Sequence, residues 1–290
     1  MEIRHVVIYQ KETCYPAVVR IPDVTPAPAI VFHIGYGAFM EMYDTVAEAF
    51  CKAGYVTLQY DGRTQQGRSA GYFRCGTEWL EDAAQGVSYV MGLKEVDRDR
   101  IGFAGLSMGG GVTLTIGSLD PRIKCLYALA PVPSWKTLLE ERWVFNQGQQ
   151  AYDAYLQDMY EDASRTAHGF PSRFVSGGYG ARGIENKPED DAAELAIRPH
   201  TSVKIPLESF FNCYLFMDAH RAAQFIDKPV CIVHGTADTS IPYKFSQQLF
   251  DVIPTENKAL HFIVGAGHIL TEDAYEDVVR IGLDWFDRWL

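Results

Sequence analysis

Short apolar runs of strand length alternate with helical stretches over the first 130 residues of this 290-residue chain. Residues 29–34, 55–60, 101–104 and 123–130 form such runs, and helical apolar spacing separates them. Two further strand-like runs, residues 3–9 and 15–21, precede them. Alternation of this kind predicts an α/β fold with a mainly parallel sheet that is covered by helices on both faces.

The alternation stops at Pro131 and resumes at Pro229. Residues 132–226 show no clear strand and are mostly helical in pattern, whereas strand and helix signals return from VCIVHG onward. We therefore expect a core built from residues 1–131 and 227–290. Residues 132–226 are predicted to be an inserted, largely helical cap that covers the site.

The predicted cap is rich in aromatic residues. They could line an apolar acyl or aromatic pocket, or they could form a small core of the cap itself; they are Trp135, Trp143, Phe145, Phe210, Phe211, Tyr214 and Phe216. Glycines at 178, 180 and 183 match the spacing of a dinucleotide-binding loop. Because IENKPEDD follows them instead of an apolar helix, we expect a flexible loop and no cofactor there.

Charge and composition exclude several classes of partner. The net charge of −11 disfavours nucleic acid and anionic membranes, and no apolar run reaches the roughly 18 residues that span a bilayer. The first twelve residues lack a basic segment followed by an apolar run, so no secretory signal is expected there. The six cysteines have neither metal-binding nor redox spacing. We expect a cytoplasmic protein without a metal. A homo-oligomer remains open.

The motif Gly-x-Ser-x-Gly occurs twice, and its context separates the two copies. Gly105-Leu106-Ser107-Met108-Gly109 lies between the strand IGFA and the helix-like run VTLTIG. A strand, a sharp turn and a helix are the setting that lifts a nucleophilic serine clear of a sheet, and small neighbours are needed at the turn. The other copy, residues 67–71, lies in a polar loop. Ser107 is therefore the predicted nucleophile.

A serine hydroxyl needs a base, and a histidine base needs a carboxylate that holds its tautomer. Asp238 follows the strand VCIVHG, and His268 follows the strand LHFIV. The carboxyl ends of parallel strands gather functional groups at one edge of a sheet. The order serine, acid, histidine is the order that this serine motif requires. We therefore predict the triad Ser107, Asp238 and His268.

The remaining histidines and one further acid have structural explanations. Asp61, in a turn after a strand, is expected to hold its own turn. His33 and His234 end strands just before glycine turns and are expected to brace those loops. The others are assigned structural roles: His5, His168, His200, His220 and His261.

An acyl-transfer intermediate also needs two N–H donors for its oxyanion. Met108, the residue after the serine, is expected to supply one. The second is expected from the loop His33-Ile34-Gly35-Tyr36-Gly37 after the strand AIVFH. Tyr36 is the first choice and Gly37 the second, while a plain turn without this role is the alternative.

The segments HIGYG, YDGR, GLSMGG, HGTAD and GAGH follow one another as family landmarks do, so the chain resembles the α/β-hydrolase superfamily over about residues 27–131 and 227–290. The stretch VDRDRIGFAGLSMGG is similar to dienelactone-hydrolase-like, acetyl-xylan-esterase-like and prolyl-oligopeptidase-like branches. The resemblance implies an eight-stranded, mostly parallel sheet and hydrolysis without a cofactor. Dienelactone hydrolases carry cysteine at the position of Ser107, which argues against that particular activity.

These observations predict a serine hydrolase that cleaves a carboxylic ester of a small molecule through an acyl-enzyme. The same residues could act on a thioester, a peptide or an activated C–C bond. A receptor that binds such a ligand without turnover is the alternative of another class.

Overall fold

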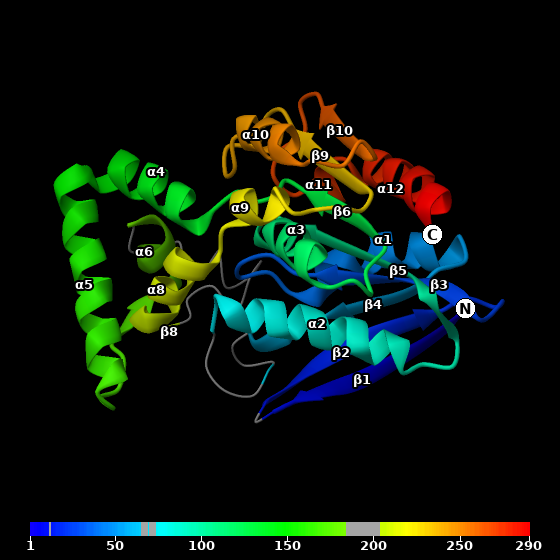
Figure 1. Ribbon diagram of the computed structural model, residues 1–290, viewed down its shortest axis with the longest axis horizontal. Helices are drawn as coiled ribbons and strands as arrows, with labels where there is room; N and C mark the ends of the chain where they lie inside the picture. Colours follow the sequence, from blue (N-terminus) through cyan, green and yellow to red (C-terminus); the bar gives the residue numbers. More distant parts are fainter. Residues whose placement is uncertain (12, 65–68, 70–73, 184–203) are drawn as a thin grey trace.

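The computed structural model describes residues 1–11, 13–64, 69, 74–183 and 204–290. Eight strands form one sheet in the order β1-β2-β4-β3-β5-β6-β9-β10 (Figure 1). The predicted eight-stranded, mostly parallel sheet is thereby confirmed. Its strands are β1 (Glu2–Gln10), β2 (Thr13–Ile21), β3 (Ala27–His33), β4 (Val56–Tyr60), β5 (Val96–Leu106), β6 (Cys125–Leu129), β9 (Val230–Gly235) and β10 (Lys258–Ile263).

Strand β2 runs antiparallel to both of its neighbours, β1 and β4, and the other neighbouring pairs are parallel. Six strands are therefore parallel and all end at the same edge of the sheet; they are β4, β3, β5, β6, β9 and β10. The loops that follow β3, β5, β9 and β10 meet there, and they carry the residues that the sequence singled out.

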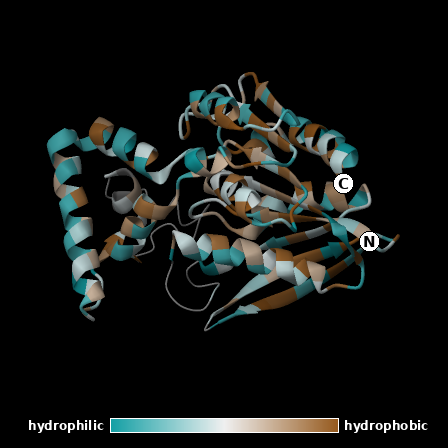
Figure 2. Ribbon diagram, viewed as in Figure 1, coloured by the Kyte–Doolittle hydropathy of each residue, from teal (hydrophilic) through white to brown (hydrophobic). Residues whose placement is uncertain are grey.

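Helices cover both faces of the sheet. Successive residues of β3 point to opposite faces: Ala29 and Val31 belong to one apolar cluster, and Ile30 and Phe32 belong to another. The first cluster includes residues of α2 (Thr77–Met91), α3 (Met108–Leu119) and α10 (Lys244–Val252). The second includes residues of α1 (Asp44–Lys52) and α12 (Tyr275–Trp289). Much of the central strands is coloured as hydrophobic in Figure 2.

The segment between β6 and β9 lies beside the sheet, and most of it is at the end opposite the two termini (Figure 1). Its elements are α4 (Trp135–Gln147), α5 (Gln149–Ala167), β7 (Phe174–Ser176), α6 (Gly177–Arg182), β8 (Lys204–Pro206), α8 (Leu207–Phe216) and α9 (Ala219–Ala223). The division of the chain into a core and a cap at residues 131 and 226 stays a prediction. The remaining short helices are η1 (Met40–Tyr43), η2 (Gly62–Thr64) and α11 (Leu270–Asp273).

Two expectations for this segment are wrong. Strands β7 and β8 pair with each other where none was expected, because strands of three residues are too short to show alternation. The expected glycine loop is instead helical over Gly177–Arg182. The Gly180 carbonyl accepts hydrogen bonds from Trp143 and Tyr155 there, so tertiary contacts override the low helix propensity of glycine. The stretch IENKPEDD and His200 lie outside the described residues.

Within the described part of the chain, no helix combines the length and the apolarity that crossing a bilayer demands.

Candidate active site

Ser107 occupies a strained turn between β5 and α3. Its φ of 61° and ψ of −120° lie in a region of backbone conformation that residues other than glycine rarely adopt. The turn is held on both sides: Ser107 N donates to Leu129 O at 2.8 Å, and Ser107 O accepts from Gly111 N at 3.1 Å and from Val132 N at 3.0 Å. The neighbouring strand β6 and the first turn of α3 therefore fix the serine in this conformation.

Both glycines of the motif are required by the close approach of other backbone atoms. A Cβ on Gly105 would lie 2.3 Å from Gly109 O, and a Cβ on Gly109 would lie 2.2 Å from His33 O. The expectation that small residues must flank the serine therefore has a definite cause here: the start of α3 packs directly on the ends of β3 and β5.

We expect Gly109→Ala to lower the free energy of unfolding by roughly 3 kcal/mol, because the added methyl group meets backbone that cannot rotate away. Urea unfolding measures this loss. Ser118→Ala, in the last turn of the same helix, is a control that should change stability by less than about 0.5 kcal/mol. Equal stability of the two variants would contradict the steric explanation.

Asp238 and His268 are hydrogen-bonded to each other. His268 Nδ1 lies 2.7 Å from Asp238 Oδ2, and Oδ1 of the same carboxylate accepts from Ser240 N at 2.7 Å and from Ile241 N at 2.8 Å. Burial alone would raise the pKa of Asp238, which is 7% exposed, but hydrogen bonds from His234, His268 and Ile241 hold that pKa below its usual value. Asp238 is therefore an anion in the range where most enzymes work.

His234 contacts the same carboxylate from the other side and is fully buried. Its Nε2 lies 3.1 Å from Asp238 Oδ2 and 2.9 Å from Ile241 O, while its Nδ1 lies 2.6 Å from Ser246 Oγ. Since both partners of Nε2 are acceptors, Nε2 carries the proton in the neutral ring, and the Ser246 hydroxyl donates to Nδ1. The predicted loop brace is thus a brace of the acid itself.

We expect His234→Ala to lower kcat about tenfold and the free energy of unfolding by roughly 2–4 kcal/mol, because a buried carboxylate loses a donor. The pKa of Asp238 should rise toward its usual value, so the stability that is lost on acidification should be smaller than in the wild type. Steady-state kinetics and urea unfolding across pH measure these effects. His234→Gln, which can restore an N–H donor, should recover part of kcat; no difference between the two variants would argue against this role.

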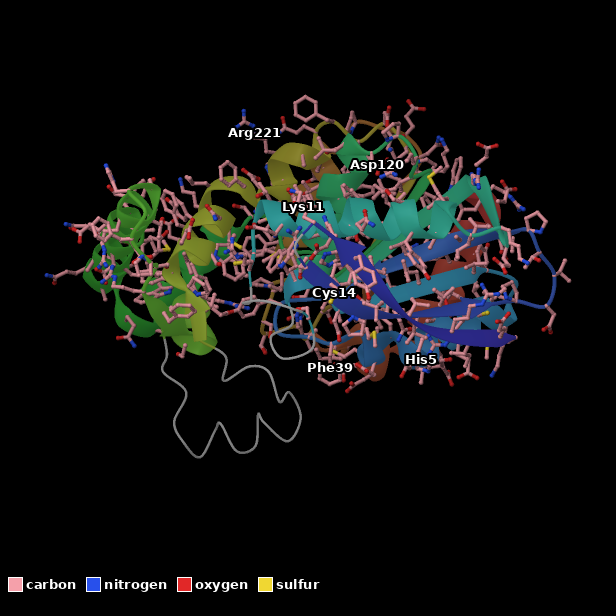
Figure 3. All side chains as sticks on the ribbon, turned by 90° about the horizontal axis from the view of Figure 1, so that it is seen from below. His5, Lys11, Cys14, Phe39, Asp120 and Arg221 are labelled. Atoms are coloured by element: carbon pink, nitrogen blue, oxygen red, sulfur yellow. The ribbon has the colours of Figure 1, made fainter. Side chains whose placement is uncertain are left out.

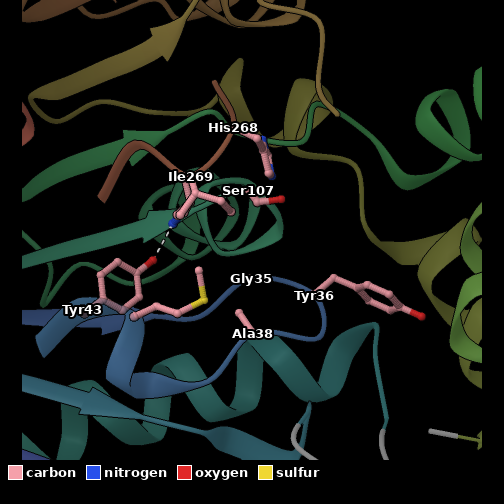
Figure 4. A pocket seen from close by; sticks show the side chains of 9 residues that line it. Gly35, Tyr36, Ala38, Tyr43, Ser107, His268 and Ile269 are labelled. Carbon is pink, nitrogen blue, oxygen red and sulfur yellow. Dashed lines mark hydrogen bonds between the residues drawn. The ribbon is translucent and has the colours of Figure 1, made fainter. Parts of the chain in front are cut away.

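Ser107 and His268 line one small pocket, with a volume of about 40 Å³ (Figure 4). That volume holds little more than water. Its walls come from the loop after β3, from η1, from the end of β5 with the serine turn, and from the loop between β10 and α11; they are Gly35, Tyr36, Ala38, Met42, Tyr43, Leu106, Ser107, His268 and Ile269. Among the described hydrogen bonds, none joins Ser107 Oγ to His268, a contact that often tightens only when substrate binds.

The loop predicted to supply the second oxyanion donor borders Ser107 directly. A Cβ on Gly35 would lie 3.2 Å from Leu106 O and 3.4 Å from Ser107 Cβ, and Tyr36 lines the same pocket. Met108 is the first residue of α3, where backbone N–H groups point out of the helix start. The two predicted donors thus flank the serine from two different elements.

The side chain of Tyr36 points away from Ser107 (Figure 4). Its hydroxyl donates to Gly177 O at 3.0 Å, and its ring centroid lies 5.5 Å from that of Trp135 and 6.5 Å from that of Phe210. The pocket lining contains no residue from the described part of 132–226. Trp135 and Phe210 are buried against Tyr36, and Phe145 is exposed, so these aromatics do not form the wall of the pocket.

Tyr43 was missed by the sequence reasoning. It is buried in η1, donates its hydroxyl proton to His33 O at 2.9 Å and accepts from Leu106 N at 2.7 Å. Ser246 was missed as well. Neither residue belongs to a motif, and only the three-dimensional arrangement brings them to the site.

The other candidates lie elsewhere or have separate roles. Burial lowers the pKa of His33 to about 4, so this ring is neutral near pH 7. Asp61, the rival acid, accepts from Met40 N at 2.8 Å and so holds the start of η1. His5 is exposed on the edge strand β1 (Figure 3). Of the second serine motif, only Ser69 lies within the described residues.

The sheet order, the strained serine turn and the strand-end acid and histidine are those of an α/β hydrolase. Comparison with known families agrees: residues 25–274 match the family model Hydrolase_4, described as serine aminopeptidase, S33. The chain therefore belongs to this family of α/β hydrolases.

Several known proteins are similar to this chain. The chain is 25% identical to the acyltransferase drtE of Aspergillus calidoustus over 279 residues, which cover 89% of this chain and 86% of that protein. The α/β hydrolase GrgF from Penicillium sp. sh18 has the same fold, with a TM-score of 0.80, 20% identity and 99% of both chains covered. A monoacylglycerol lipase of Paleococcus ferrophilus matches with a TM-score of 0.64, 19% identity, and 99% and 98% of the two chains covered.

Proposed function

We propose that this α/β hydrolase cleaves carboxylic esters of small molecules through an acyl-enzyme. The observation that carries the proposal is the shared pocket of Ser107 and His268, together with the 2.7 Å hydrogen bond from His268 to the buried Asp238. A strained serine, an imidazole at the same pocket and a carboxylate behind that imidazole are the parts that acyl transfer requires.

In the proposed reaction, Ser107 Oγ attacks the ester carbonyl while His268 Nε2 takes the hydroxyl proton. The Met108 and Tyr36 N–H groups hold the oxyanion, and His268 then returns the proton to the leaving alcohol. Water repeats the sequence on the acyl-enzyme and releases the acid. Asp238 keeps the proton of His268 on Nδ1 throughout, because Oδ2 can only accept.

Labelling with a fluorophosphonate tests the nucleophile. We expect one adduct per chain, located on Ser107 by peptide mapping. Folded protein that remains unlabelled would favour the receptor alternative, in which a ligand binds without turnover. A panel of nitrophenyl esters, matched thioesters and amino-acid nitroanilides then ranks the ester against the thioester and peptide alternatives.

A second candidate reaction is acyl transfer to an alcohol acceptor instead of water. The similarity to the acyltransferase drtE supports it, and both reactions share the same acyl-enzyme. Adding small alcohols to the ester assay separates them: a transferase forms new ester in excess of free acid, whereas a hydrolase forms mainly the acid.

A cytoplasmic location is part of this proposal. The six cysteines are free thiols, and five of them are buried, as in proteins of reducing compartments.

A further inference from the structure

The parallel ladder between β3 and β5 ends one residue before the serine turn. Its last pair is His33 with Gly105. Leu106 follows Gly105, so Leu106 N and His33 O are the groups that a further parallel rung would join. The Tyr43 hydroxyl is hydrogen-bonded to both of these groups.

Both hydrogen bonds of that hydroxyl are well formed. The distance from Leu106 N to Tyr43 Oη is 2.7 Å, drawn as the dashed line in Figure 4, and the distance from Tyr43 Oη to His33 O is 2.9 Å. Tyr43 is 2% exposed, and its ring centroid lies 5.1 Å from that of Phe32. The hydroxyl therefore uses its one proton and one lone pair on the backbones of two different strands.

The two strands part at this point. Beyond His33 the chain enters the loop that carries Gly35 and Tyr36, and beyond Leu106 it enters the turn of Ser107. The small pocket lies between those two segments, and Tyr43 itself is part of its wall.

We propose that Tyr43 is a positioning residue: its hydroxyl links the ends of β3 and β5 and thereby holds the serine turn at a fixed separation from the loop of residues 33–37. This inference rests on the proposed function. In that reaction, the separation of the two segments places the Met108 and Tyr36 N–H groups on opposite sides of one oxyanion. Such donors must be held to within about 0.5 Å to act together. Tyr43 touches no reacting atom and acts through the two backbones.

The test is Tyr43→Phe, which keeps the ring and removes the hydroxyl. We expect kcat for a small ester to fall about 10- to 100-fold, while KM changes less than about threefold, because the oxyanion forms only in the transition state. The affinity for a trifluoromethyl ketone, which forms a tetrahedral adduct with the serine, should fall by a similar factor. Binding of the product carboxylic acid should change little.

Tyr127→Phe is the matched control. Tyr127 is also buried, and its hydroxyl donates to a backbone carbonyl, Val278 O, at 2.8 Å. Its loss should lower stability without lowering kcat. If both variants lose stability and neither loses kcat, Tyr43 is merely structural and the inference is wrong.

A second variant guards against poor folding of Tyr43→Phe. Incorporation of 4-aminophenylalanine at position 43 supplies a donor and an acceptor at the same place, and we expect it to retain kcat within about fivefold. A loss above tenfold in this folded variant would overturn the inference. Failure of the proposed function looks different, because the wild-type chain would then neither turn over esters nor react with a fluorophosphonate.

Discussion

Ser107→Ala should lower kcat for ester cleavage by about 10⁴–10⁶, since the acyl-enzyme can no longer form. The remaining rate should come from the oxyanion donors and from binding of the substrate. The alanine Cβ replaces one that the turn already accommodates, so the free energy of unfolding should change by less than about 1 kcal/mol.

Steady-state kinetics and fluorophosphonate labelling check this expectation together. Ser69→Ala is the control, because Ser69 is the central serine of the second Gly-x-Ser-x-Gly copy; it should keep wild-type kcat and wild-type labelling. Turnover of Ser107→Ala above about one hundredth of the wild-type rate would refute the assignment of the nucleophile.

Asp238→Asn should lower kcat by about 10⁴ with little loss of folded structure. The carboxylate accepts from N–H groups through both of its oxygens: Oδ1 binds Ser240 N and Ile241 N, and Oδ2 binds His268 Nδ1 and His234 Nε2. An asparagine that keeps its oxygen toward the two backbone groups must turn its NH₂ toward His268. The imidazole would then carry its proton on Nε2, where it cannot accept one from Ser107.

The rival acid supplies the control for this experiment. Asp61→Asn retains an oxygen that can accept from Met40 N, so kcat should stay within about tenfold of the wild-type value. Rates measured across pH for both variants decide between the two acids. If Asp61→Asn proved the more damaging substitution, the assignment of Asp238 would be lost.

The parts of the fold that could be predicted are those with a local signal. The strand–serine–helix turn was recognisable because the glycines at 105 and 109 are dictated by backbone atoms 2.2–2.3 Å from any added Cβ. Asp238 and His268 were recognisable because each follows an apolar strand. Parallel strands bring such positions to one edge whatever the connecting segments do.

The missed features depend on contacts between distant segments. Tyr43 is placed by the ends of two strands, and Ser246 is placed by an imidazole twelve residues earlier. No periodicity marks either residue. Strands β7 and β8 pair across a separation of 28 residues or more and have three residues each, so neither carries a pattern of its own.

The ring of Tyr36 has a consequence for protein engineering. This side chain leaves the loop of residues 33–37 and is packed on Trp135 and Phe210, with its hydroxyl on Gly177 O. If the five-residue loop were transplanted into another scaffold, its large aromatic ring would lose these neighbours. Experiments that exchange segments between related proteins should therefore move the loop together with α4 and α8.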